Sequence, residues 1–142
     1  TLGIAMQESR SQAQIDMLIA DFFAAFDNRD GRIPQKDTVE RLFSEKAVIS
    51  VHREGLLEIF STTDFITPRI RLLTNGDLVD FYEWEETAST QVAGEIAART
   101  SRYSKLGTYK GLPYSGSGTK FFHLARLPSG WRIVALLWTD DA

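Results

Sequence analysis

The chain has 142 residues, of which 43% are hydrophobic, 25% charged and 11% aromatic, the composition of an ordinary globular domain. It has no cysteine, which excludes disulfides, thiolate nucleophiles, Cys-based zinc sites and iron–sulfur clusters. Sixteen Lys and Arg against nineteen Asp and Glu leave a net charge of −3, and no basic run is present to bind a phosphate backbone, so we expect no nucleic-acid partner.

We expect one domain over residues 1–142, with residues 1–10 as a loose N-terminal extension. The longest apolar stretches, such as residues 133–138, fall far short of the ~20 residues that a membrane span needs. No charged-then-apolar leader opens the sequence. These features predict a cytoplasmic protein without a membrane partner.

The first part of the chain has helical periodicity. Large apolar side chains recur every three or four residues and would form one face of a long helix: Ile15, Leu18, Ile19, Phe22, Phe23 and Phe26. Ser11 and Gln14 form a capping box for its start, and residues 28–31 end it. Asp37 and Glu40 indicate a short second helix before the apolar residues that follow.

A β-branched run at residues 47–51 predicts the first strand, and a third helix follows it. Residues 61–64 offer several N-caps for this helix, and Asn75-Gly76 ends it. Pro68 would remove an interior hydrogen bond. We therefore expect a helix that begins late, near Thr67, or one that is bent.

From residue 77 onward the apolar residues alternate with a period of two, which is typical of strands. The alternating runs cover residues 78–87, 95–106, 119–127 and 131–139. A turn at residues 90–94, a glycine-containing loop at 107–118 and a tight hairpin turn at 128–130 would connect them. Three helices followed by a strand meander predict an α+β fold, in which an antiparallel sheet wraps around the long N-terminal helix.

Two segments carry a resemblance to a known family: residues 94–107, GEIAARTSRYSKLG, and residues 130–141, GWRIVALLWTDD. Both resemble a branch, without assigned function, of the nuclear transport factor 2-like superfamily, which includes SnoaL-like polyketide cyclases and ketosteroid isomerases. The resemblance implies a cone-shaped α+β fold over nearly the whole chain, with a curved antiparallel (mixed) sheet around the long N-terminal helix. The same fold carries enzymes, binding modules and assembly domains, so it does not by itself imply an activity.

The resemblance can be tested against the isomerase mechanism, in which a tyrosine on the first helix and an aspartate at the end of the first strand act on the substrate. Phe22 stands about where the tyrosine would be, and Val51 about where the aspartate would be. Phenylalanine cannot donate a hydrogen bond and valine cannot take a proton. The isomerase mechanism is therefore not supported.

His52 is the titratable residue nearest to that strand end, where a neutral imidazole could act as a general base. The alternative is a surface histidine before the turn at residues 53–55. His123 shares an alternating face with Phe121 and could enter the pocket or bind a neighbouring strand. The two histidines have no metal-ligand spacing, and we expect no metal site.

Arg99 and Tyr103 share one face of an alternating run. Facing inward, they would bind a carboxylate or carbonyl oxygen; facing outward, they would belong to a solvated surface or a dimer contact. Glu83 and Glu85 also share a face. They could supply a pocket carboxylate with a raised pKa, or form a solvated cluster paired with Arg99 or Arg102 of the next strand.

Trp138 and Asp140 share a face at the end of the last alternating run and could supply a pocket wall and a polar anchor. Equally, Trp138 could cap the core while Asp140 lies in solvent.

The last run is apolar on both faces, with residues 131, 133, 135 and 137 on one and residues 134, 136 and 138 on the other. One face can pack on the helices, so the other predicts a homodimer through the convex side of the sheet.

We expect an apolar pocket between the first helix and the sheet that binds a small, largely hydrophobic organic molecule without a cofactor. Its expected lining is Phe22, Phe26, Arg99, Tyr103, His123, Trp138 and Asp140. The alternatives are a cofactor-independent isomerase, cyclase or dehydratase, with His52 or a buried carboxylate as its base, and an oligomerisation domain.

Overall fold

The computed structural model describes residues 2–142 and begins with the long helix α1 (Leu2–Ala24). Its apolar stripe faces the sheet: Ile15 and Ile19 are fully buried, and Phe22 is 1% exposed. The predicted start at Ser11 is wrong, and residues 2–10 form helix rather than a loose extension. They contain no proline and are rich in good helix formers such as Ala, Met, Gln and Glu, so the helix continues beyond the core. Thr1 lies outside the described residues.

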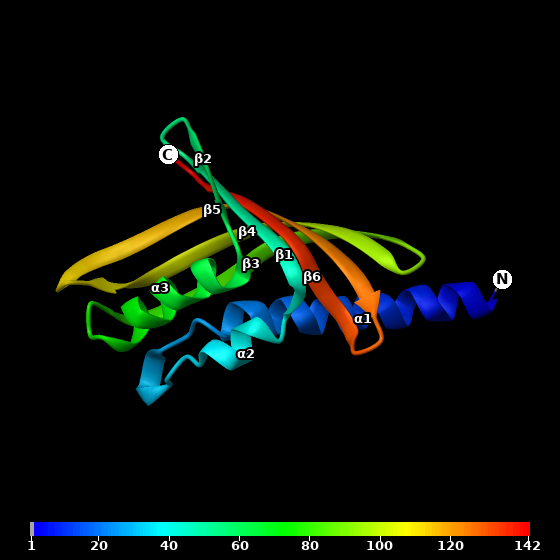
Figure 1. Ribbon diagram of the computed structural model, residues 1–142, viewed down its shortest axis with the longest axis horizontal. Helices are drawn as coiled ribbons and strands as arrows, with labels where there is room; N and C mark the ends of the chain where they lie inside the picture. Colours follow the sequence, from blue (N-terminus) through cyan, green and yellow to red (C-terminus); the bar gives the residue numbers. More distant parts are fainter. Residues whose placement is uncertain (1) are drawn as a thin grey trace.

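The six strands form one curved, open sheet that wraps around α1 (Figure 1). The strands are β1 (Phe43–Arg53), β2 (Leu56–Phe60), β3 (Leu78–Ala93), β4 (Ile96–Tyr109), β5 (Leu112–Leu127) and β6 (Gly130–Asp140). Their order across the sheet is β2-β1-β6-β5-β4-β3. β1 and β6 are parallel and the other neighbours are antiparallel, so the sheet is mixed. The cone-shaped α+β fold predicted from the sequence is confirmed.

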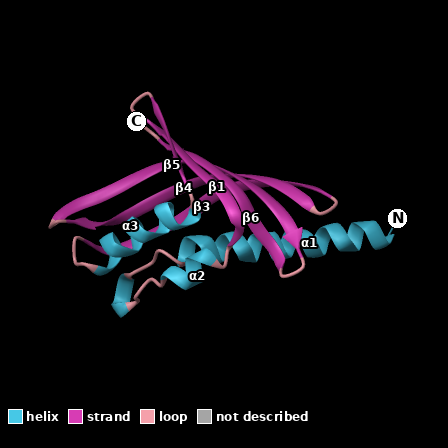
Figure 2. Ribbon diagram, viewed as in Figure 1, coloured by secondary structure: helices cyan, strands magenta, loops and turns pink. Residues whose placement is uncertain are grey.

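The shorter helices lie with α1 on the concave side of the sheet (Figure 2). They are the 3-10 turn η1 (Arg29–Gly31), α2 (Lys36–Glu40) and α3 (Thr62–Thr74). The predicted late start of α3 is wrong, because the Ser61 side chain caps the helix by accepting a hydrogen bond of 3.1 Å from the backbone N–H of Asp64. Pro68 lies inside α3, which tolerates the one missing backbone hydrogen bond.

The β-hairpins are longer than the sequence predicts. β3 continues to Ala93, so the turn is confined to residues 94–95, and the predicted loop at 107–118 is the end of β4, a tight turn and the start of β5. Lys110 and Gly111 make this turn with positive φ angles of 48° and 81°. Glycine and serine favour a loop locally, but continuous pairing between β4 and β5 satisfies their backbone groups. β2 was not predicted; it forms a short edge hairpin with β1.

A β-bulge in β6 changes which side chains face the core. His123 and Leu124 are consecutive in β5, yet they pair with Ala135 and Ile133, so Val134 is the extra residue. Trp131 and Ile133 therefore lie on the same buried face as Leu136 and Trp138. The prediction that these two pairs lie on opposite faces is wrong, because period-two counting fails across a bulge.

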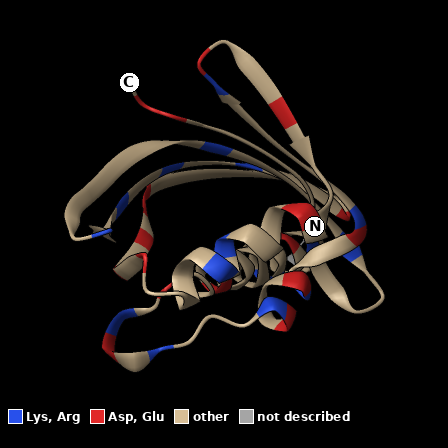
Figure 3. Cartoon of the chain, turned by 60° about the vertical axis from the view of Figure 1, so that its left-hand side comes forward, with Lys and Arg blue, Asp and Glu red and all other residues tan. Residues whose placement is uncertain are grey.

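Basic and acidic residues are interspersed along the helices and strands (Figure 3). No helix within residues 2–142 is long and apolar enough to cross a membrane.

Candidate functional site

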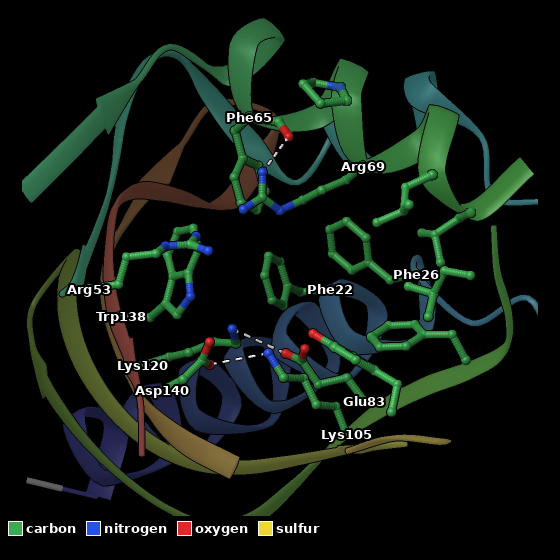
Figure 4. A pocket seen from close by; sticks show the side chains of 16 residues that line it. Phe22, Phe26, Arg53, Phe65, Arg69, Glu83, Lys105, Lys120, Trp138 and Asp140 are labelled. Carbon is green, nitrogen blue, oxygen red and sulfur yellow. Dashed lines mark hydrogen bonds and ion pairs between the residues drawn. The ribbon is translucent and has the colours of Figure 1, made fainter. Parts of the chain in front are cut away.

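A cavity of about 330 Å³ lies between α1, α3 and the concave face of the sheet (Figure 4). Its apolar lining comes from both helices, the turn after α1 and three strands: Phe22, Phe26, Phe65, Pro68, Leu72, Leu73, Leu78, Phe81, Tyr114 and Trp138. Aromatic rings dominate, and Phe65 packs edge-on against both Phe26 and Trp138, with ring centroids 6.2 and 5.5 Å apart. Three predicted ligand-binding residues, Phe22, Phe26 and Trp138, are therefore in the cavity wall.

The sheet side of the cavity carries two ion pairs (Figure 4). The Nζ atom of Lys105 lies 3.2 Å from Oδ1 of Asp140, and the Nζ atom of Lys120 lies 3.1 Å from Oε1 of Glu83. Lys120 also lies over the ring of Tyr103, 4.0 Å from its centroid. Strands β3, β4, β5 and β6 each supply one charged group, and each pair joins two strands that are separated by one intervening strand.

Tyr103 is 1% exposed and supports this wall from behind. Its hydroxyl donates a short hydrogen bond to Asp140, across β5. Gly118 is paired with both Tyr103 and Asp140, and a Cβ atom there would collide with the tyrosine hydroxyl. Glycine at this position is therefore what allows Tyr103 to reach Asp140.

Burial and neighbouring charges set the ionisation of these groups. Burial lowers the pKa of Lys120, although the Glu83 carboxylate opposes the shift. Burial raises the pKa of Tyr103, and Asp140 raises it further, so the hydroxyl stays protonated as a donor. Burial would also raise the pKa of Asp140, but the Tyr103 hydrogen bond and the Lys105 ammonium outweigh it and leave this pKa below its usual value.

Two arginines line the opposite side of the cavity, Arg69 on α3 and Arg53 at the end of β1 (Figure 4). Nη1 of Arg69 donates a hydrogen bond of 2.9 Å to the backbone oxygen of Phe65, and the guanidinium lies 4.1 Å from the centre of the Phe65 ring. Burial, and secondarily repulsion from Arg53, lower the pKa of Arg69 to about 10. Arg69 therefore remains charged at neutral pH.

Arg99 faces inward, as one of the two predicted orientations has it, but it does not line the cavity. Its Nη2 lies 2.6 Å from Oε1 of Glu85 on β3, and its Nη1 lies 2.6 Å from Oδ1 of Asp16 on α1. Nη1 also donates to Oγ1 of Thr90 at 2.9 Å. The side chain thus joins the sheet to the first helix, and the predicted pairing between Arg99 and the acidic run of β3 is confirmed for Glu85.

Neither histidine reaches the cavity. His52 and His123 are exposed and alternate with buried neighbours such as Val51 and Phe122, so both lie on the convex face. A base in this cavity cannot come from His52, and His123 cannot contact a ligand there. Within residues 2–142, no three His, Cys, Asp or Glu side chains are grouped to hold a metal ion.

Sequence reasoning missed several charged groups of the site: Arg53, Arg69, Lys105 and Lys120. Two of them carry a signal in the sequence. Lys120 has the same phase as the apolar residues Phe122 and Leu124, and Arg69 lies four residues after Phe65 on the buried side of α3. A charged residue in the phase of an apolar stripe indicates a buried charge, and buried charges are unusual unless they are paired or functional.

The sequence matches no protein-family model and no curated protein. Its fold is similar to that of several solved structures. An NTF2-like superfamily protein from Salmonella enterica has 16% identity and a TM-score of 0.76 over 95% of this chain and 94% of the other. An NTF2-like protein from Novosphingobium aromaticivorans has 17% identity and a TM-score of 0.74, over 97% of this chain and 86% of the other. The hexachlorocyclohexane dehydrochlorinase LinA-type3 from Novosphingobium barchaimii has 16% identity and a TM-score of 0.75, over 97% of this chain and 91% of the other.

At identities this low, structural similarity shows a shared fold and not a shared activity. The three helices, the mixed curved sheet and these structural neighbours together give the result that the resemblance in the sequence predicted. The chain has the fold of the nuclear transport factor 2-like superfamily.

Proposed function

We propose that the chain binds a small, partly apolar organic molecule in the cavity between α1, α3 and the sheet. The cavity itself supports this function, because its wall is largely aromatic and aliphatic while a few charged groups converge on it. That combination is typical of small-molecule sites, in which apolar surface supplies affinity and few polar groups supply orientation. From the sequence we expected a largely hydrophobic ligand. The four cationic side chains of the wall favour a ligand that also has a polar end.

A cofactor-independent isomerase, cyclase or dehydratase is the second candidate, and Glu83 is the observation in its favour. This carboxylate lines the cavity and is only 12% exposed, which suits a buried base. Its side chain is engaged in an ion pair with Lys120 at 3.1 Å, and Asp140 is likewise held by Lys105 and Tyr103. A carboxylate engaged in this way would have to leave its partners before it could take a proton from a substrate, so we rank binding ahead of catalysis.

Blocking the cavity tests the binding function. Leu72→Trp would fill part of the space, whereas Thr63→Trp places the same side chain on the exposed side of α3 as a control. We expect the neutral probe 2-naphthamide to bind the wild type and the control alike, and the Leu72 variant at least about tenfold more weakly, because one aromatic anchor contributes of the order of 1–3 kcal/mol. Isothermal titration calorimetry measures the affinities, and thermal melts verify folding.

Equal affinity of both tryptophan variants would place the probe outside the cavity, and no binding to the wild type would contradict the proposed function.

We also propose that the chain forms a homodimer through the convex face of the sheet. An apolar row supports this: Ile59, Leu137 and Phe121 are linked through directly paired residues of β2, β1, β6 and β5. Their exposed fractions are 65%, 43% and 49%, and Val48, 50% exposed, lies on the same face. An exposed patch of large apolar side chains is typical of an interaction surface. The cytoplasmic location stays a prediction from the sequence.

Introducing a charge into this row tests the dimer. Phe121→Glu would place a carboxylate within the proposed contact, which costs several kcal/mol when it is desolvated without a partner. We expect the wild type to sediment as a dimer at micromolar concentration and the Phe121 variant as a monomer. Gln7→Glu makes the same charge change on the exposed side of α1 and should leave the dimer intact. A wild-type monomer, or a variant that remains dimeric, would contradict the proposal.

A further inference from the structure

The charges around the cavity do not balance. Four cationic side chains line it, Arg53, Arg69, Lys105 and Lys120, against only two carboxylates. Both carboxylates are already engaged by the lysines, at 3.2 and 3.1 Å. The excess positive charge therefore belongs to the two arginines, which are on the opposite side of the cavity.

Arg69 is the less compensated of these two arginines. Arg53 has a carboxylate neighbour, because its Nε lies 3.7 Å from Oε1 of Glu58. Arg69 forms no ion pair with any carboxylate of residues 2–142, and the backbone oxygen of Phe65 is the hydrogen-bond acceptor that the structure gives it. Its guanidinium is partly buried among aromatic rings, 4.1 Å from the centroid of Phe65 and 5.2 Å from that of Trp138.

Burying a charge without a counterion is costly, and placing a second cation beside it raises the cost. Arg69 and Arg53 are close enough for this repulsion to contribute to the shifted pKa of Arg69. An anion held between α3 and the end of β1 would remove the penalty. The guanidinium lies against the rings of Phe65 and Trp138, and one of its N–H groups donates to the backbone oxygen of Phe65. A guanidinium is planar, so its remaining N–H groups match the geometry of a carboxylate.

We propose that the ligand of this cavity is a small organic monocarboxylate with an aromatic or alicyclic body, whose carboxylate pairs with Arg69. This inference rests on the proposed binding function and names the chemical class of its ligand. One negative charge suffices, because Arg69 is the one lining cation of residues 2–142 that lacks a carboxylate neighbour. The body of the ligand would contact the apolar lining around Phe22 and Phe26. A hydroxyl or carbonyl group at its far end would meet the Lys105–Asp140 and Lys120–Glu83 pairs.

Two probes of nearly equal shape separate the carboxylate from the ring. 2-Naphthoate carries the charge, and 2-naphthamide is its neutral counterpart. We expect the wild type to bind 2-naphthoate at least about tenfold more tightly than 2-naphthamide in calorimetric titrations, because charge-assisted bonds are roughly twice as strong as neutral ones. In Arg69→Met the preference should fall to about twofold or less, through a loss confined to 2-naphthoate.

Arg69→Lys keeps the charge but not the planar fork, so it should retain part of the preference. Arg71→Met removes an exposed cation two residues away on the same helix and should behave as the wild type. Equal wild-type affinity for the two probes, or an unchanged preference in Arg69→Met, would overturn the carboxylate assignment while leaving the binding function in place. Failure of both probes to bind would contradict the binding function and the assignment together.

Discussion

Replacing Ile19 by alanine is expected to lower the free energy of unfolding by about 3 kcal/mol, the middle of the range for deleting a fully buried isoleucine side chain. Ile19 is 0% exposed and lies on the stripe of α1 that faces the sheet. The substitution removes apolar contact and leaves a cavity that the surrounding strands can only partly fill. Alanine is a good helix former, so the loss arises from packing and not from the helix itself.

Met17→Ala is the matched control for this prediction. Met17 is two residues away on the same helix and is 67% exposed. Its truncation should change the free energy of unfolding by about 0.5 kcal/mol or less, the usual range for surface positions. Urea denaturation followed by circular dichroism measures both variants. Similar losses in the two would show that this stripe of α1 is not the face that packs against the sheet.

Arg99→Met is expected to cost about 3 kcal/mol, because removing one partner of a buried ion pair leaves the other without compensation. Arg99 is 6% exposed and the side chain of Glu85 is 19% exposed. After the substitution, the Glu85 carboxylate would keep its hydrogen bond from Ser101 but lose both bonds from the guanidinium. Asp16 is 52% exposed and returns to water at little cost.

Arg102→Met provides the control for the Arg99 variant. Arg102 lies on the same strand and pairs with Asp141 at 2.6 Å, but both side chains are more than 40% exposed. Its loss should cost far less than the loss of Arg99, because water screens an exposed ion pair. Because Arg99 does not line the cavity, its variant should also keep wild-type affinity for 2-naphthamide within about twofold wherever it is folded. A large loss of affinity with unchanged stability would instead assign Arg99 to ligand binding.

Much of the architecture is readable from local patterns. The stripe from Ile15 to Phe26 identifies α1, and the turn at residues 128–130 identifies the β5–β6 hairpin, because a helix or hairpin places nearby residues in contact. The boundaries were less predictable. The helix continues to Leu2, and the strands continue through residues 107–118 where the composition favoured a loop. There, pairing with a neighbouring strand outweighs local preference.

The site was predictable only in part. Phe22, Phe26, Trp138 and Asp140 line the cavity as expected. Phe22 lies on the inward face of α1, Phe26 lies in the turn that follows this helix, and the other two residues lie on the inward face of β6. The two histidines were the natural candidates for chemistry but lie on the convex face. Titratable character in the sequence carries no information about which face of a sheet a residue occupies.

The sequence by itself determined the class of fold, the long amphipathic helix, the order of helices before strands and the apolar nature of the interior. Only the tertiary structure decided which charges enter the cavity. The bulge at Val134 sets the face of Trp138, Gly118 allows Tyr103 to reach Asp140, and α3 brings Arg69 opposite Lys120. These are contacts between distant segments, and periodicity describes only the relation of a residue to its near neighbours along the chain.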